Sequence, residues 1–324
     1  MIGNKISEIQ RFNLDTIRGL SATPKSLESK YFYDDKGSIL FQKIMNLPEY
    51  YLTNSETDNF ENYSQDIIRY LYQYKDFQLI ELGCGDGIKT KILLEKLIAE
   101  KLNFTYVPID ISELSIQSFS KKLKDEFPGI KINPYIGDYL ETLDILHHDK
   151  YLKSLPRMVL FLGSNLGNFS QPETDAFLKR LSGNFNQGDL FLLGLDLVKS
   201  PHIIKNAYDD KEGITREFNL NLLQRMNREL GSNFDLSHFE HYTYYDICNQ
   251  EVLSFLVSNR EQDVFFESSG RVFHFNKWEK IFMERSHKYT LEDIQSLADN
   301  HGFEILNNFL DSQEYFCNSL WRKF

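Results

Sequence analysis

A mostly apolar run with an acidic residue next to its end, followed by alternating glycines, constrains the fold more than any other part of this sequence. The run covers residues 78–82, and the glycines are Gly83, Gly85 and Gly87. Glycine tolerates positive φ and lets a ligand approach the main chain. The helix predicted to start at Ile88 offers free N–H groups and the positive end of its dipole. The segment therefore predicts a buried strand, a tight turn and a helix that can accept the adenosine end of a nucleotide-like cofactor.

The spacing of these glycines argues against a dinucleotide cofactor. The dinucleotide fingerprint is G-x-G-x-x-G, whereas this turn reads G-x-G-x-G, with Glu81 before its first glycine. The pattern resembles the first motif of class I S-adenosylmethionine (SAM) methyltransferases. The next predicted strand, residues 104–110, ends in Asp110, at about 25 residues beyond Gly85, where a ribose-binding carboxylate is expected. Asp110 could also cap a helix.

Length and charge limit the classes of function. A chain of 324 residues can form one large domain or two smaller ones. The net charge of −11, without a basic run, disfavours nucleic-acid binding. The N-terminus lacks the apolar core of a signal peptide, and no apolar run reaches transmembrane length. We therefore expect a cytoplasmic monomer that binds neither nucleic acid nor membrane, with Cys84, Cys248 and Cys317 as free thiols.

Alternating strand and helix patterns predict a doubly wound α/β sheet from residue 55 onward. The predicted strands are 78–82, 104–110, 130–136, 158–162 and 190–195, with a closing pair at 303–306 and 315–321. Ser112 is expected to cap the helix after the second strand, and residues 170–173 read as a capping box. The loop 163–169 follows the fourth strand, at the carboxyl edge where open α/β sheets bind ligands.

The remaining residues interrupt this alternation and predict a second domain. Helices are expected at 7–20, 203–208 and 214–230, and β ribbon at 246–259 and 263–275. The tyrosines of segments 30–38 and 47–53 either fill surface and core or form a pocket wall. The predicted fold is α/β: a class I SAM-methyltransferase doubly wound sheet (55–198 and 288–324) with a second, smaller α+β substrate-binding domain (1–54 and 199–287).

Several stretches together resemble the histidine Nα-methyltransferases, the SAM-dependent enzymes that make hercynine (trimethylhistidine) for ergothioneine. They are residues 33–38, 47–53, 81–87, 161–168, 194–199, 207–210 and 284–289. The resemblance covers nearly the whole chain, and its P-E-Y-Y and A-Y-D-D segments are more specific than the glycine turn. It implies SAM-dependent methylation of the α-amino group of L-histidine. Relatives in this family methylate tryptophan derivatives, so another aromatic amino acid is the alternative substrate.

The resemblance also implies residue roles. It implies that SAM is held by Gly83, Lys89, Asp110, Asp138 and Tyr139, with Gly163 beside the point of methyl transfer. As a single acid in a turn, Asp138 also has a purely structural interpretation. The amino acid's amino and carboxylate groups would be bound by Tyr50, Asn168 and Tyr208, its imidazole by Glu284 and Ser286, and Tyr33 would lie near the reacting nitrogen. Tyr33, Tyr50 and Gly163 are the predicted catalytic residues, and no metal is expected.

One position departs from the family pattern. The strand 251–257 is expected to line the ring pocket, where the family would place a bulky methionine. This sequence has Ser254 there, with Leu253 beside it. The departure bears on the shape of the pocket and on the identity of the ring.

Competing functions have weaker support in the sequence. The groups His147-His148-Asp149 and His238-Phe239-Glu240-His241 could ligate a metal, but neither has a recognised partner set. No G-x-S-x-G elbow indicates a hydrolase, and the glycine spacing disfavours a nicotinamide oxidoreductase. A non-catalytic SAM-fold scaffold would be expected to have lost Asn168, Tyr208 or Glu284, and all three are present.

Overall fold

A computed structural model describes residues 8–85, 87–111, 113–148 and 154–324. Their contacts divide the chain into two compact units. Unit 1 comprises Met1–Tyr51 and Lys199–His287, and unit 2 comprises Leu52–Val198 and Lys288–Phe324. Among the described residues, no helix combines the length and the apolar stretch needed to cross a membrane.

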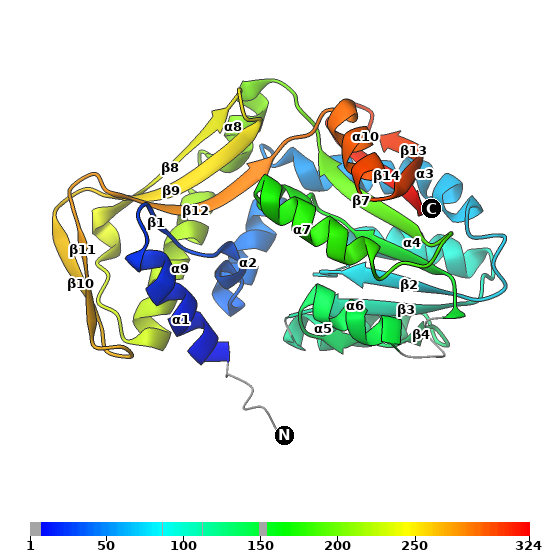
Figure 1. The fold of residues 1–324 in the computed structure, drawn as a ribbon, viewed down its shortest axis with the longest axis horizontal. Helices are drawn as coiled ribbons and strands as arrows, with labels where there is room; N and C mark the ends of the chain where they lie inside the picture. Colours follow the sequence, from blue (N-terminus) through cyan, green and yellow to red (C-terminus); the bar gives the residue numbers. More distant parts are fainter. Residues whose placement is uncertain (1–7, 86, 112, 149–153) are drawn as a thin grey trace. The chain divides into compact units, whose positions relative to one another are not determined.

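Unit 2 is built on a mostly parallel sheet (Figure 1). The strand order is β13 (Phe303–Leu310), β14 (Phe316–Lys323), β7 (Leu190–Asp196), β6 (Arg157–Phe161), β2 (Phe77–Leu82), β3 (Phe104–Asp110) and β4 (Lys131–Ile132), and β5 (Tyr135–Ile136) also pairs with β3. Strand β14 runs antiparallel to both of its neighbours. The chain extends from β2 to β3 on one side and places β6 on the other, so the switch point where such sheets bind ligands lies between β2 and β6.

Helices cover both faces of this sheet because every residue of β2 is buried and its side chains alternate between the faces. Ile80 and Leu82 pack with α6 (Tyr139–His148), α7 (Gln171–Ser182) and α10 (Leu291–Asn300). Phe77 and Leu79 pack with α3 (Tyr51–Arg69), α4 (Ile88–Ala99) and α5 (Glu113–Glu126). The predicted doubly wound α/β sheet is therefore confirmed.

The predicted third strand, 130–136, is wrong in its continuity. The structure has two short strands, β4 and β5, separated by Asn133 and Pro134. Proline has no N–H to donate to a ladder, so it interrupts strand pairing. The capping box at Ser170 is confirmed, because Glu173 accepts a hydrogen bond from the Ser170 N–H at 2.8 Å. Ser112, the predicted cap of the next helix, lies outside the described residues.

Unit 1 combines helices with a sheet that is antiparallel except for the parallel pairing of its short edge strand. Its four-stranded sheet has the order β1 (Lys25–Ser26), β12 (Lys280–His287), β9 (Glu251–Ser258) and β8 (Phe239–Asp246), and β10 (Gln262–Phe266) pairs with β11 (Arg271–Phe275). The helices are α1 (Glu8–Ser21), α2 (Asp35–Met45), α8 (Pro201–Tyr208) and α9 (Ile214–Leu230), with short 3-10 turns η1 (Ser29–Phe32) and η4 (Leu236–His238). A single apolar cluster joins α1, α2, α9 and the sheet.

The predicted ribbon at 246–259 needs correction, because residues 247–250 form a turn between β8 and β9. Strand β8 was not predicted. Its sequence is mostly Tyr, His, Glu and Thr, and as an edge strand it does not show a clean apolar alternation.

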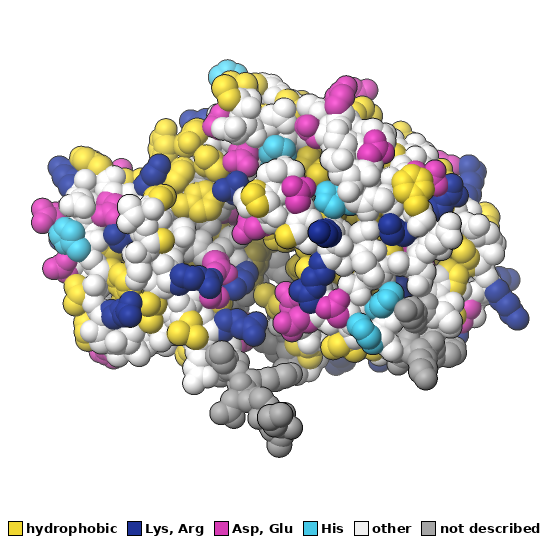
Figure 2. Space-filling view, viewed as in Figure 1, with side chains coloured by type: hydrophobic (Ala, Val, Ile, Leu, Met, Phe, Trp, Pro, Cys, Tyr) yellow, Lys and Arg dark blue, Asp and Glu magenta, His cyan; other side chains and the backbone are white. Residues whose placement is uncertain are grey.

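On the face that Figure 2 shows, basic side chains are interspersed with acidic ones.

Candidate functional site

In the turn after β2, glycine is favoured by the positive φ of the backbone and, at two positions, by close packing. Gly83, Gly85 and Gly87 all have positive φ, at 76°, 52° and 67°. A Cβ on Gly83 would lie 2.7 Å from the Tyr139 hydroxyl, and one on Gly87 would lie 1.8 Å from the Phe119 ring. A Cβ on Gly85 would meet nothing within 4 Å. The turn is therefore tightly packed at its ends and open to a ligand at Gly85.

Asp110 lies next to this turn, as the sequence predicts. The parallel pairing of β2 with β3 sets Leu82 opposite Ile109, and the Gly83 N–H donates to the Ile109 carbonyl at 2.8 Å. The Gly85 N–H then donates to Asp110 Oδ2 at 3.2 Å. The carboxylate is thus held at the rim of the open turn.

Asp138 and Tyr139 come from the start of α6. The Asp138 side chain accepts from the N–H groups of Leu140 and Glu141 at 2.9 and 3.1 Å, so it caps this helix. Tyr139 places its hydroxyl beside Gly83. Burial raises the pKa of that hydroxyl, and the charge of Asp110 raises it further. Asp138 therefore has a structural role as a helix cap, and the residue remains exposed.

Lys89 and Gly163 are close together at the carboxyl edge of the sheet. Lys89, in the first turn of α4, pairs with the buried carboxylate of Glu56. Gly163 follows β6 with φ of 74°, and a Cβ there would lie 3.5 Å from Lys89 Nζ. Asn168 ends the 3-10 turn η3 (Asn165–Asn168) of the same loop and is half-buried.

Glu81, the acid before the first glycine, is buried inside the strand. Its carboxylate accepts hydrogen bonds from the hydroxyls of Thr90 and Tyr106. Burial raises the pKa of Glu81 to about 7, against the lowering effect of these hydrogen bonds. Glu81 therefore supports the turn from within and does not line its open side.

In unit 1 the predicted tyrosines form a connected row of rings. The ring centroids of Tyr33 and Phe41 are 5.4 Å apart, those of Phe41 and Tyr50 6.3 Å, and those of Tyr50 and Tyr208 6.4 Å. The Tyr208 hydroxyl, at the end of α8, donates to Ser286 Oγ on β12 at 2.8 Å. The structure thus brings Tyr33, Tyr50, Tyr208 and Ser286 into one neighbourhood.

Glu284 lies on the same face of β12 as Ser286, because the two are separated by one residue of a strand. Glu284 is half-buried and Ser286 is buried. Opposite Glu284 on β9 is Ser254, itself 3% exposed, and opposite Ser254 on β8 is Thr243. This face therefore carries a row of acidic and hydroxyl groups.

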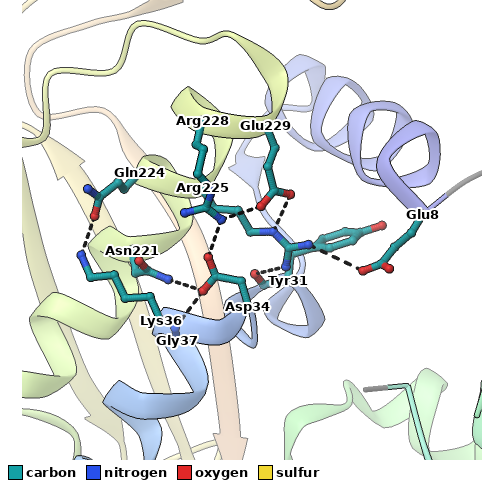
Figure 3. A network of polar contacts seen from close by, with 10 residues as sticks. All are labelled: Glu8, Tyr31, Asp34, Lys36, Gly37, Asn221, Gln224, Arg225, Arg228 and Glu229. Carbon is teal, nitrogen blue, oxygen red and sulfur yellow. Dashed lines mark hydrogen bonds and ion pairs between the residues drawn. The ribbon is translucent and has the colours of Figure 1, made fainter. Parts of the chain in front are cut away.

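A polar network that was not predicted fixes the segment carrying Tyr33 (Figure 3). Asp34 caps α2 by accepting from the Gly37 N–H at 2.8 Å, and it also accepts from Asn221 and Arg228 of α9, both at 2.7 Å. A Cβ on Gly37 would lie 1.7 Å from the Phe32 carbonyl oxygen. The capping signal, an aspartate before a helical pattern, was visible in the sequence, whereas its two partners lie far along the chain.

The predicted residues thus fall into two groups. Unit 2 contains the residues predicted to bind SAM and two residues of the loop after β6: Gly83, Lys89, Asp110, Asp138, Tyr139, Gly163 and Asn168. Unit 1 contains Tyr33, Tyr50, Tyr208, Glu284 and Ser286. All residues predicted to bind the amino-acid substrate lie in the described part of the chain. Among them, only Asn168 belongs to unit 2. Glu56 was missed, because an acidic residue in a helix carries no sequence signal of its burial.

Three of the histidines considered for a metal have other partners. Nδ1 of His147 and of His148 lies 3.1 and 2.6 Å from main-chain carbonyl oxygens, and Nδ1 of His238 lies 3.1 Å from Asn259 Oδ1. Asp149 lies outside the described residues. In the part of the chain that the structure describes, no group of three or more His, Cys, Asp or Glu side chains is arranged to hold a metal ion.

Comparison with known proteins gives close relatives. Histidine N-alpha-methyltransferase of Mycolicibacterium smegmatis is 35% identical over 288 residues, covering 89% of this chain and 87% of that protein. The enzyme of the same name from Mycobacterium tuberculosis is 34% identical over 309 residues, covering 95% and 94%. Ergothioneine biosynthesis protein 1 of Schizosaccharomyces pombe is 28% identical over 288 residues, which are 87% of this chain and 37% of that protein.

A more distant relative acts on another amino acid. L-tryptophan methyltransferase of Psilocybe serbica is 26% identical over 326 residues, covering 93% of this chain and 90% of that protein. The family described as histidine-specific methyltransferase, SAM-dependent, matches residues 12–323. That match spans both units, so the predicted resemblance is confirmed. This chain belongs to the family of SAM-dependent, histidine-specific methyltransferases.

Proposed function

We propose that this protein transfers methyl groups from SAM to the α-amino nitrogen of L-histidine, as far as the trimethylated betaine hercynine. The observation that carries the choice of histidine is the placement of Glu284 and Ser286 on one face of β12. A carboxylate accepts a hydrogen bond from an imidazole N–H, and a hydroxyl can serve the second ring nitrogen. A substrate that lacks these partners would leave buried polar groups unpaired, which gives strong discrimination.

The residues of unit 2 fit SAM. Gly83 and Gly85 expose main chain at a turn with open space beside Gly85. The Asp110 carboxylate at its rim suits a ribose diol, and the Lys89 ammonium suits a carboxylate. Asp138 and Tyr139 are proposed to contact the adenine. When bound, SAM supplies an electrophilic methyl group to the amine.

The residues of unit 1 suit a small zwitterion with an aromatic ring. Tyr50 and Tyr208 are proposed to bind its amino and carboxylate groups, and the family resemblance assigns the same role to Asn168. The Tyr208 hydroxyl is already oriented, because it donates to Ser286 Oγ. In this proposal unit 2 is the SAM-binding domain and unit 1 the substrate-binding domain.

Catalysis would consist mostly of positioning. The α-amino group is largely protonated near neutral pH, so it must lose a proton before it accepts a methyl group. The hydroxyls of Tyr33 and Tyr50 would orient a water molecule that takes this proton, and their ring faces suit the quaternary ammonium product. Gly163, without a side chain, leaves space for the reacting nitrogen to come within about 3–3.5 Å of the methyl group.

We also propose that the protein works in the cytoplasm as a monomer. All three cysteines are free thiols, and Cys84 and Cys317 are buried. Disulfides are rare in reducing compartments, so free thiols support this location.

The test is incubation of the purified protein with methyl-labelled SAM and a panel of free amino acids. We expect label in histidine and not in alanine or glutamate, and mass spectrometry should find a product that carries three added methyl groups. Label in tryptophan alone would contradict the proposed substrate. Absence of label from every amino acid, with SAM binding intact, would favour a non-catalytic scaffold.

A second substrate, tryptophan or another aromatic amino acid, is favoured by one observation. Ser254, opposite Glu284, is a small residue where the family resemblance predicts a bulky methionine. A smaller side chain there leaves more room for a larger ring. The relative that methylates tryptophan is more distant than those that methylate histidine, so histidine remains the first choice.

A further inference from the structure

Glu56 of α3 is fully buried, although glutamate is rarely buried unless it is paired. Its carboxylate accepts from the Gly163 N–H at 3.1 and 3.0 Å and from Asn318 Nδ2 at 3.1 Å. It also forms an ion pair with Lys89. These partners come from the loop after β6, from β14 and from the start of α4, so one carboxylate joins three segments of unit 2.

The sheet makes room for this carboxylate. Gly194 on β7 lies opposite Asn318 on β14, and a Cβ on Gly194 would lie 2.3 Å from Glu56 Oε1. Gly194 has no special backbone conformation that requires glycine, since its φ is not positive. A side chain at Gly194 is therefore excluded by Glu56 first, and also by main-chain atoms of Leu162 and Gly163, each 3.2 Å from that Cβ. The space lies near the carboxyl ends of β6 and β7, beside the switch point of the sheet.

The ion pair holds Lys89 in a defined place. The Lys89 side chain is 22% exposed and that of Glu56 is 0% exposed. The ammonium is therefore held by a buried carboxylate and is still accessible to a ligand from solvent. An ammonium has three N–H donors, and the pairing with Glu56 does not use all of their directions. Without the carboxylate, the long lysine side chain would regain its rotamer freedom.

We propose that Glu56 is a positioning residue for SAM: its carboxylate fixes the Lys89 ammonium and the Gly163 N–H, so that Lys89 is preorganised for the carboxylate of the donor's methionine part. The inference rests on the role proposed above for Lys89. It deepens that role by assigning a function to a residue that does not itself touch the donor. Preorganisation of this kind increases affinity because less freedom is lost on binding.

The test compares two ligands in the absence of any amino acid. S-adenosylhomocysteine carries the amino-carboxylate part, whereas 5′-methylthioadenosine keeps the nucleoside and lacks that part. In Glu56→Gln, calorimetry should show the Kd of S-adenosylhomocysteine raised about tenfold or more, as for loss of a charged hydrogen-bond partner. The Kd of methylthioadenosine should stay within about twofold. Equal weakening of both ligands, or of neither, would overturn the proposal.

A double-mutant cycle tests whether Glu56 acts through Lys89. Lys89→Met alone should weaken S-adenosylhomocysteine, and adding Glu56→Gln should weaken it no further, because coupled residues are not additive. Full additivity would contradict the mechanism. The matched control is Asp189→Asn, a buried carboxylate at the opposite edge of the sheet that accepts from the Arg157 and Asn186 N–H groups at 3.0 and 2.8 Å.

The control should lower Tm without the ligand-specific effect. If Asp189→Asn selectively weakens S-adenosylhomocysteine as Glu56→Gln does, the effect belongs to sheet stability and the proposal is wrong. Should Glu56→Gln fail to fold, Asn318→Ala removes one donor to the same carboxylate and allows the same two-ligand comparison. A protein that shows the expected pattern but does not methylate histidine would overturn the proposed substrate and leave this inference standing.

Discussion

Glu284 on β12 lies directly opposite Ser254 on β9, and the antiparallel pairing gives both side chains the same face of the sheet. Ser254 lies in turn opposite Thr243 on β8, with their hydroxyl oxygens 3.3 Å apart. The carboxylate proposed to bind the substrate ring therefore has a small, buried hydroxyl residue as its neighbour. This relationship makes the size of the ring pocket testable.

Ser254→Met should make the pocket more selective for histidine. The longer side chain would fill space beside Glu284, and differences of one or a few methylenes in a pocket change selectivity by about 10–200-fold. We expect the ratio of kcat/KM for histidine to that for tryptophan to rise about tenfold. The control is Leu253→Met, because Leu253 points to the opposite face and the swap conserves volume. A ratio unchanged in Ser254→Met would show that Ser254 does not line the pocket.

Glu284→Ala should impair histidine use far more than donor binding. Loss of a charged hydrogen-bond partner of the imidazole should lower kcat/KM for histidine by about 10–100-fold, while the Kd of S-adenosylhomocysteine stays unchanged. Steady-state kinetics and calorimetry measure the two effects separately. Glu240→Ala, an exposed acid on β8 of the same sheet, is the control and should behave as wild type. Equal histidine kinetics in Glu284→Ala and wild type would remove Glu284 from the pocket.

The sequence predicted local elements better than their partners. The strand–turn–helix around Gly83 and the acid at the end of β3 were predictable because φ requirements and apolar runs are local properties. The roles of Glu56 and Asp34 were not, because each depends on residues more than a hundred positions away, such as Gly163 for Glu56 and Asn221 for Asp34. Burial of a charge is decided by such distant donors and leaves no local pattern.

The predicted strand 130–136 shows that a local apolar pattern can also mislead. Its apolar residues suggested one strand, but Pro134 divides it into β4 and β5. Strand β8 was missed because it lacks the expected apolar alternation. On this half-exposed edge strand, polar residues with high β propensity take the place of apolar ones. The aromatic row from Tyr33 to Tyr208 could be suspected from the abundance of tyrosine, whereas its order depends on how α2, α8 and β12 pack.

Asp34→Asn should destabilise the protein and make its remaining stability less dependent on acid. Burial acts to raise the pKa of Asp34, but hydrogen bonds from Arg228, Gly37 and Asn221 outweigh it and hold the pKa below its ordinary 3.8. A carboxyl with a depressed pKa stabilises the fold fully above the unfolded value and loses this contribution as pH falls through the folded value. At pH 7 we expect a loss of about 1–2 kcal/mol in the free energy of unfolding, because asparagine can still cap the helix but loses the charge-assisted hydrogen bond with Arg228.

Urea unfolding of wild type and Asp34→Asn at pH 7, 5 and 3 measures this difference, which should shrink at the lowest pH. The same variant should lower histidine turnover, because the network holds the segment that carries Tyr33. Glu8→Gln, at the exposed edge of the network on α1, should have little effect on either property. A gap between wild type and Asp34→Asn that widens toward low pH would contradict the assigned contacts.

Glu81→Gln should change the pH dependence of stability in the opposite sense. Burial raises the pKa of Glu81 to about 7 in the folded protein, from 4.5, so between these values the folded state binds more protons than the unfolded state. Stability contributed by this group therefore falls as pH rises, by up to about 1.4 kcal/mol per pH unit. The glutamine side chain of the variant is neutral at every pH, so the variant should gain stability relative to wild type between pH 5 and pH 8, as measured by urea unfolding. In Tyr106→Phe, which keeps Glu81, the stability contributed by Glu81 should be lost at higher pH than in wild type. The reason is that the Tyr106 hydroxyl lowers the pKa of the Glu81 carboxyl. A constant difference between Glu81→Gln and wild type across this range would mean that Glu81 stays ionised in the folded protein.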